Sequence, residues 1–286
     1  MAEMLTAEEV AARVRDLPAL PTVVTEVLRV TRDPDSSVFD LTEVLARDQA
    51  LTAKVLRLAN SALFGFPRRI ATLSDAVVLL GFHTIKSLAI AGSAFSVMDR
   101  AVEGYGLERG WMWQHGIAAG AAARFLAKKW RPALAEEAFI GGLLHDLGKI
   151  VLDSYVGEAF DEIIKKVRRE NKPFASAERD ILGFDHAAVG ALVAEAWALP
   201  GDLVAAVRYH HSPSEATEDT ALVGLAHLGN IVALSTGFGV GADGLAAPLD
   251  GDVLAQLGLG VGHVEEAIAQ MPDALADSEQ LLELER

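Results

Sequence analysis

Apolar residues recur every three to four positions along most of the chain, the spacing that lines one face of an α-helix. Between residues 50 and 60, for example, Leu51, Val55, Leu58 and Ala59 fall on one helical face. We find no convincing run of alternating apolar and polar residues of the kind that forms a strand. The pattern therefore predicts an all-α protein.

Capping residues and glycines indicate where the N-terminal helices begin and end. Thr6 and Glu9 form a capping box that opens a helix to about residue 15, and Pro21 starts a helix that ends near residue 31. Ser37 or Asp40 caps residues 41–46, Asp48 can cap residues 50–60, and Ser74 caps residues 75–80 before Gly81. Further helices are predicted over residues 83–98, 106–129, 135–150, 157–170, 185–197, 201–209 and 219–235.

Two glycine-containing stretches, residues 99–106 and 236–251, divide the chain into three predicted parts. Residues 1–100 form an N-terminal helical subdomain, and residues 101–235 form a helical subdomain that carries most of the histidines. Residues 236–286 form a Gly-rich linker followed by acidic C-terminal helices, expected over 249–257 and 273–285.

The composition limits the chemistry and the compartment. The chain of 286 residues is 51% hydrophobic and has no cysteine, which excludes disulfides, zinc–thiolate sites and thiol catalysis. A cytoplasmic location is the expectation, because the N-terminus also has no signal-peptide pattern. The most apolar stretch, residues 77–98, is interrupted by His83 and Lys86, so we expect a buried helix pair rather than a membrane span.

Negative charge is concentrated in the C-terminal quarter. The net charge is −15, and the last 78 residues hold 13 acidic residues against the single basic residue Arg286. Binding to nucleic acid needs clustered Lys and Arg, so this distribution opposes it. The acidic segment is either a solvated surface or a docking surface for a basic partner.

Histidines and one carboxylate provide the candidate chemistry. His145 and Asp146 are adjacent, with His115 30 residues upstream, His186 41 residues downstream, and His210-His211 beyond. On one helix His145 and Asp146 would point about 100° apart, close enough to bind one cation. Imidazole and carboxylate ligands suit Fe, Mn, Ni or Zn, and nothing indicates an organic cofactor.

Lys149 lies one helical turn after this doublet, where it could hold a phosphate oxygen or pair with Asp146. A divalent cation beside it could lower the pKa of bound water and assist attack on a phosphate. A single histidine in a helix is more often a surface or core residue than a ligand, and we assign His83, His227 and His263 to that group. His211 either adds a second ligand beside His210 or faces solvent.

The run His145-Asp146-Leu147-Gly148-Lys149, with the surrounding histidines, resembles the HD superfamily of metal-dependent phosphohydrolases and its HD-GYP branch, which hydrolyses cyclic di-GMP. The resemblance implies that His115, His145, Asp146, His186, His210 and His211 bind metal. Three departures weaken the implied hydrolysis. Ser212-Pro213 follows the histidine pair instead of Gly-Tyr-Pro, Asn230 replaces a final Asp, and Trp111 stands where a Glu is frequent.

The N-terminal half is similar to the HDOD family, an HD-related output domain of bacterial signal transduction. The similarity rests on several separated motifs: Leu17-Pro18-Ala19-Leu20-Pro21, Asp33-Pro34-Asp35, Arg47-Asp48-Gln49-Ala50-Leu51-Thr52, Leu56-Arg57-Leu58-Ala59-Asn60-Ser61 and Ala76-Val77-Val78-Leu79-Leu80-Gly81. It covers residues 14 to 235 and implies a multi-helix bundle of HD type with an N-terminal helical subdomain.

Two functions remain open from the sequence. One is a non-catalytic signalling module that binds partner proteins, with a metal that is structural or sensory. The other is a metal-dependent phosphohydrolase that acts on a nucleotide such as cyclic di-GMP, with Asp146 and Lys149 as its catalytic residues. We expect signalling proteins as partners, with a nucleotide as the second candidate, and neither nucleic acid nor a membrane.

Overall fold

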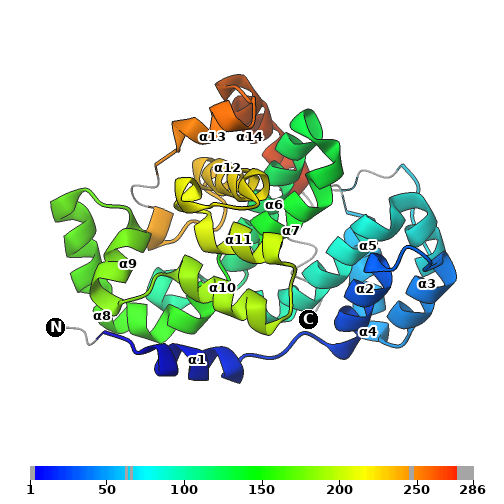
Figure 1. Cartoon of the computed structure of the whole chain (residues 1–286), viewed down its shortest axis with the longest axis horizontal. Helices are drawn as coiled ribbons and strands as arrows, with labels where there is room; N and C mark the ends of the chain where they lie inside the picture. Colours follow the sequence, from blue (N-terminus) through cyan, green and yellow to red (C-terminus); the bar gives the residue numbers. More distant parts are fainter. Residues whose placement is uncertain (1–3, 62–63, 65–66, 245–247, 276–286) are drawn as a thin grey trace. The chain divides into compact units, whose positions relative to one another are not determined.

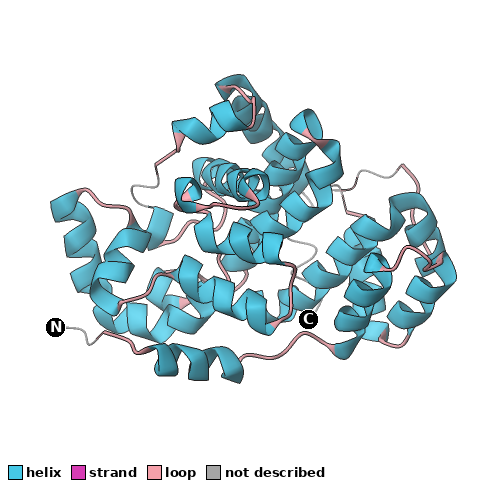
Figure 2. Cartoon of the chain, in the orientation of Figure 1, coloured by secondary structure: helices cyan, strands magenta, loops and turns pink. Residues whose placement is uncertain are grey.

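The chain is helical throughout the part that the structure describes. The computed structural model describes residues 4–61, 64, 67–244 and 248–275. Helices account for its long elements (Figure 2), and the described residues contain no strand beyond one isolated bridge between Val102 and Leu107. The all-α fold predicted from the hydrophobic pattern is confirmed.

The chain divides into two compact units. The smaller unit comprises Ala19–Val97 with Pro272–Arg286, and the larger comprises Met1–Pro18 with Met98–Met271. The helices of the smaller unit are α2 (Thr22–Arg32), α3 (Val38–Ala46), α4 (Gln49–Ala59) and nearly all of α5 (Leu73–Met98) (Figure 1).

The predicted caps of the smaller unit are largely confirmed. Ser37 and Asp40 form a capping box for α3, and Asp48 accepts a hydrogen bond from the Leu51 amide at the start of α4. The cap predicted at Ser74 is wrong, because the Thr72 hydroxyl accepts the Asp75 amide and α5 begins earlier. Short polar side chains at neighbouring positions compete for the same free amides, and the backbone geometry selects between them.

Helix α5 contains a break at Gly81. The residue has φ 79° and ψ 167°, a conformation that side chains disfavour, so the chain changes direction there as predicted. Leu73–Met98 is long and apolar enough to cross a membrane by length and composition alone. However, 61% of its most apolar window is buried within the protein, as in the core helix of a globular domain.

The larger unit packs its helices around α6 (Trp111–Trp130). This helix contacts α7 (Ala135–Leu144) and α12 (Thr220–Thr236), while α10 (His186–Ala196) contacts α8 (Gly148–Glu170) and α11 (Gly201–Tyr209) (Figure 1). The other elements are α1 (Ala7–Asp16), η1 (Glu103–Tyr105), η2 (Pro132–Leu134), α9 (Phe174–Leu182), η3 (Pro213–Glu215), η4 (Ala242–Gly244), α13 (Gly251–Gln256) and α14 (Val261–Leu275).

The predicted helices of this unit differ from the structure in several places. The helix expected over 135–150 is two helices, because the chain turns at residues 145–147 between α7 and α8. Helices α9 and α14 were not predicted, and α8 begins at Gly148 rather than near residue 157. Of the helix expected over 273–285, residues 273–275 belong to α14, and residues 276–285 lie outside the described residues.

Glycines allow α6 and α7 to approach backbone to backbone. A Cβ atom on Gly142 would lie 2.7 Å from the carbonyl oxygen of Ala119, and one on Gly120 would lie 2.7 Å from that of Phe139. Real Cβ atoms do not come so close, so both positions need glycine. This contact places the C-terminal end of α7 directly against the middle of α6.

Candidate metal centre

All six residues predicted to bind metal come together in the core of the larger unit. His115 lies on α6, the His145-Asp146 doublet lies between α7 and α8, His186 is the first residue of α10, and His210-His211 follow α11. Five of the six are buried, and His211 is half-buried. Residues that are up to 96 positions apart in sequence therefore form one cluster, which we call the histidine cluster.

Local backbone geometry aims the doublet into the cluster. α7 ends at Leu144, and the Leu147 amide bonds to the Leu144 carbonyl at 3.1 Å, so the doublet occupies a tight turn. Gly148 follows because α10 passes so close that a Cβ there would lie 1.9 Å from the His186 carbonyl oxygen. The Gly after the doublet is thus required by packing against a ligand-bearing helix.

The Asp146 carboxylate stands between two groups of imidazoles. On its Oδ1 side, His186 Nε2 lies at 3.4 Å and His210 Nε2 at 3.8 Å, and His211 Nε2 lies 2.8 Å from His186 Nε2. Donor atoms around one cation with bonds of about 2.1 Å lie roughly 3–4 Å apart. The spacing of these groups therefore fits a single cation.

The Oδ2 side of Asp146 holds a second group. His145 Nε2 lies 3.2 Å and His115 Nε2 3.6 Å from Oδ2. The Lys149 Nζ atom lies 2.5 Å from the same oxygen, and its side chain is buried. The pairing of Lys149 with Asp146, one of two roles expected from the sequence, is present in the structure.

Hydrogen bonds to backbone carbonyl groups make the Nε2 atoms of His145 and His210 available as ligands. The Nδ1 atoms of His115, His145 and His210 face the carbonyl oxygens of Phe238, Gly142 and Val207 at 3.1, 2.6 and 2.7 Å. A carbonyl oxygen only accepts, so the Nδ1 atoms of His145 and His210 carry the proton and their Nε2 atoms present lone pairs. His115 differs, because its Nε2 atom also faces an oxygen, Asn230 Oδ1 at 3.1 Å. Among the described residues, the buried Nε2 atoms of His145 and His210 have no hydrogen-bond partner. Buried lone pairs of this kind fit a metal ion.

Glu178 orients His186 from outside the cluster. Its Oε2 accepts a hydrogen bond from His186 Nδ1 at 2.6 Å, and its Oε1 accepts the hydroxyl of Tyr105. Both Glu178 and Tyr105 are fully buried. A carboxylate behind an imidazole fixes the ring and increases the basicity of its other nitrogen.

The charges in the cluster perturb its acids and bases strongly. Burial alone raises the pKa of Asp146, but His145 and the Lys149 ammonium lower it well below its usual value. Burial lowers the pKa of His186, but the Glu178 carboxylate outweighs burial and raises it to about 9. Burial, together with neighbouring imidazoles, lowers the pKa of His210 and of His211 well below the ordinary value.

The departures from a hydrolase pattern also have a structural counterpart. Asn230 is buried on α12, with its Oδ1 3.1 Å from His115 Nε2, so an uncharged amide stands where a carboxylate would add a negative charge. Trp111, one turn before His115, is the first residue of α6 and offers no ligand oxygen. Asp146 is the one carboxylate in either group of candidate ligands among the described residues.

A family model for the HDOD domain matches residues 17–213. The chain belongs to the HDOD family. An uncharacterized protein of Treponema pallidum (strain Nichols) is 30% identical over 214 residues, which cover 74% of this chain and 41% of that protein. The HDOD chain thus spans about two fifths of the length of the curated relative that it matches.

Solved structures of two bacterial proteins share this HDOD fold. An HDOD domain protein of unknown function from Geobacter sulfurreducens superposes with a TM-score of 0.76 at 23% identity, covering 96% of this chain and 99% of its own. A candidate phosphohydrolase from Shewanella amazonensis SB2B superposes with a TM-score of 0.74 at 26% identity, covering 98% of this chain and 100% of its own.

Glu178 and Tyr105, which support the histidine cluster of this HDOD domain, were not predicted from its sequence. One signal was present: Phe174, Glu178 and Leu182 are spaced by four, so Glu178 falls on the apolar face of α9. His227, assigned to a structural role, bonds through Nδ1 to the His210 carbonyl at 2.8 Å and accepts the Asp250 amide through Nε2 at 3.1 Å. It therefore holds the backbone that carries His210.

Proposed function

We propose that this HDOD domain is a signalling module that holds one divalent cation in its histidine cluster and acts by binding other signalling proteins. The observation that carries the proposal is the convergence of buried imidazole lone pairs on Asp146, whose own side chain is 3% exposed. A cation bound only by the folded chain would stabilise the helical core. The absence of cysteine fits a reducing compartment, so we place the module in the bacterial cytoplasm.

The cation belongs on the Oδ1 side of Asp146, held by His186, His210 and His211. Lys149 already provides a positive charge at Oδ2, and a dication on that oxygen would be repelled by the ammonium. Two dications would also share a single coordinating carboxylate, since Asn230 is neutral. Imidazole-rich sites with one carboxylate suit Zn, Fe, Ni or Mn.

Hydrolysis is the less favoured function because the cluster is enclosed. The side chains of His145, His186 and His210 have no exposed surface, and that of Asp146 is 3% exposed. A hydrolase must admit a phosphate ester and an attacking water to the metal. In the described conformation the cluster offers neither group a direct path along these four side chains.

A metal-dependent phosphohydrolase remains the second candidate function. Two groups of ligands share Asp146, which is an arrangement that could support a two-metal site. The related protein from Shewanella amazonensis is named as a candidate phosphohydrolase. In this alternative Lys149 would leave Asp146 and hold a phosphate oxygen of a nucleotide such as cyclic di-GMP.

Elemental analysis of the purified protein tests the metal. We expect one Zn, Fe, Ni or Mn per chain in the wild type and a loss of that metal in the His186→Ala variant. His263→Ala is the matched control, because the His263 ring accepts an amide hydrogen bond within its own turn and belongs to neither group of candidate ligands. Equal metal content in wild type and His186→Ala would refute the site.

The Lys149→Met variant separates the two functions. If Lys149 only balances the charge of Asp146, its removal should strengthen cation binding by about tenfold or more, since one competing positive charge is lost. If Lys149 holds substrate phosphate, its removal should abolish turnover of cyclic di-GMP in the presence of Mn²⁺. Turnover by the wild type that is lost in both Lys149→Met and Asp146→Ala would favour the phosphohydrolase.

A further inference from the structure

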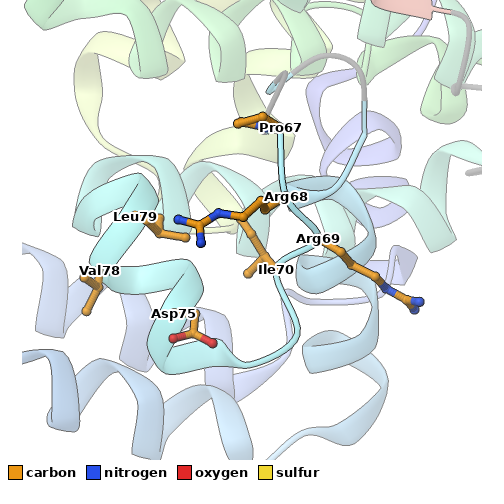
Figure 3. Close-up of a pocket in the computed structure, with 7 residues that line it drawn as sticks. All are labelled: Pro67, Arg68, Arg69, Ile70, Asp75, Val78 and Leu79. Atoms are coloured by element: carbon orange, nitrogen blue, oxygen red, sulfur yellow. The ribbon is translucent and has the colours of Figure 1, made fainter.

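A pocket on the smaller unit lies between the start of α5 and the loop that precedes it (Figure 3). Its volume is about 430 Å³, enough for one or two large side chains of another molecule. It is lined by Pro67, Arg68, Arg69, Ile70, Asp75, Val78 and Leu79.

Two apolar side chains at this pocket face solvent. Val78 is 69% exposed and Leu79 is 51% exposed, and they are neighbours on α5. Single exposed apolar residues are ordinary on a protein surface, but an adjacent pair that lines a cavity marks a contact site. The cavity therefore offers an apolar side chain a place to bury.

The pocket also carries positive charge. Among the described residues, neither Arg68 nor Arg69 has a hydrogen bond or an ion pair. Residues 19–97 hold eight basic and seven acidic residues, in a chain whose net charge is −15. Unpaired arginines beside an apolar pocket favour a partner that is acidic, because opposite charges across an interface select and orient the partner.

The two arginines are not equivalent. Figure 3 shows the Arg68 guanidinium extending toward Leu79, whereas Arg69 points away from that side chain. Asp75 lies at the other end of the pocket and accepts the Thr72 hydroxyl at 2.7 Å. The pocket is thus polarised, with a positive end at Arg68 and a negative end at Asp75.

The loop that carries the arginines is fixed to α4. The Asn60 side chain accepts the Ile70 amide at 2.7 Å and donates to the Ile70 carbonyl at 2.9 Å, and Ile70 itself is 3% exposed. Two hydrogen bonds from one amide side chain hold the backbone in place. Asn60 belongs to the Leu56–Ser61 motif, which contributes no residue to the histidine cluster. Its bonds to Ile70 show that Asn60 positions the loop that carries the arginines.

We propose that this pocket is the docking site for an acidic amphipathic helix of a partner protein. A leucine-type side chain of the partner fills the cavity against Val78 and Leu79, and a neighbouring carboxylate pairs with Arg68. The pre-positioned loop lowers the entropic cost of binding. The site is independent of the histidine cluster and extends the proposed function by stating the chemistry of the partner.

The test measures binding of the full chain to a fluorescent helical peptide of about five turns, with Leu along one face and Glu on its flanks. We expect Arg68→Glu to weaken binding by about tenfold or more, since charge attraction becomes repulsion. The matched control, Arg69→Glu, should change the affinity by less than about threefold. Leu79→Ser should weaken binding by about tenfold, because the apolar contact is lost. All three positions are exposed, so equal melting temperatures should confirm that the variants fold.

Three results would overturn the proposal. The first is equal affinity for a control peptide in which every Glu is Lys, or an equal effect of Arg68→Glu and Arg69→Glu. The second is a change of oligomeric state caused by Leu79→Ser, which light scattering would detect and which would assign the pocket to a second copy of the chain. The third is tenfold tighter peptide binding by a Glu283→Gln, Glu285→Gln variant, which would make the chain's own acidic C-terminal residues the occupant.

Discussion

Replacing Glu178 by glutamine removes a charge behind His186 while keeping the size of the side chain. The carboxylate bonds to His186 Nδ1 at 2.6 Å and also accepts the Tyr105 hydroxyl. A carboxylate in this position contributes about 10- to 100-fold to metal affinity, or about 1.4–2.8 kcal/mol. The same carboxylate raises the pKa of His186 to about 9, so a proton must leave Nε2 before a metal binds.

These two effects of Glu178 oppose each other near neutral pH. At pH 7, a pKa of about 9 reduces the apparent affinity by about 100-fold, because only about 1% of His186 is deprotonated. Above pH 9 this competition disappears. We therefore expect Glu178→Gln to weaken zinc binding by about 10- to 100-fold at pH 9.5, and to change it far less at pH 7.

A competition assay with a fluorescent zinc chelator across pH 6.5–9.5 measures both limits. The wild-type affinity should rise steeply with pH up to about 9, and the rise should flatten in Glu178→Gln. Tyr105→Phe is the control, because it leaves the charge and the bond to His186 in place. An affinity loss in Glu178→Gln that is the same at every pH would refute the assigned role of Glu178.

Three further predictions concern stability, measured by urea unfolding. Gly148→Ala should destabilise the protein by about 3 kcal/mol, because the added Cβ atom clashes with the α10 backbone. Gly201→Ala is the control and should stabilise the protein by about 0.5–1 kcal/mol, because an added Cβ atom there meets no atom within 4 Å. Similar effects of the two substitutions would contradict the close packing. In the metal-free protein, the pKa of His210 is lower in the folded chain than in the unfolded chain, so the unfolded chain takes up the proton first as the pH falls. The free energy of unfolding should therefore decrease below pH 6.5, by up to about 1.4 kcal/mol per pH unit. The same dependence of this free energy on pH in a His210→Gln variant would argue against this cause. Thr6→Ala should cost about 1 kcal/mol, because the capping box at α1 is lost, and no change would show that α1 does not unfold with the core.

The helices that the sequence predicted well are those with local signals. Thr6, Ser37 and Asp48 cap helices by hydrogen bonds to amides within three residues, which the sequence displays directly. The turn at the His145-Asp146 doublet has no such signal. Residues 135–150 are compatible with one continuous helix, and the chain turns there because α10 and the cluster occupy the space around Gly148.

The sequence identified the residues of the histidine cluster but not their arrangement in space. Its six members were predicted from their match to a known family, and the structure brings all six together, while their binding of a metal stays a prediction. The pairing of Lys149 with Asp146 follows from their local spacing, whereas the role of Glu178 depends on how α9 packs against the start of α10. Such a contact arises from packing, so no local pattern fixes which residue Glu178 meets.

The contact between α8 and α10 has a mechanical consequence. At Gly148 the two backbones touch directly, with no side chain between them to slide or repack. His186 begins one of these helices and the His145-Asp146 doublet leads into the other, so the ligands on both cannot move apart without separating the pair. A cation bound by these ligands would therefore restrict local opening of α8 and α10. Removal of the cation would allow the two helices to open together, and amide hydrogen exchange would accelerate at the start of both.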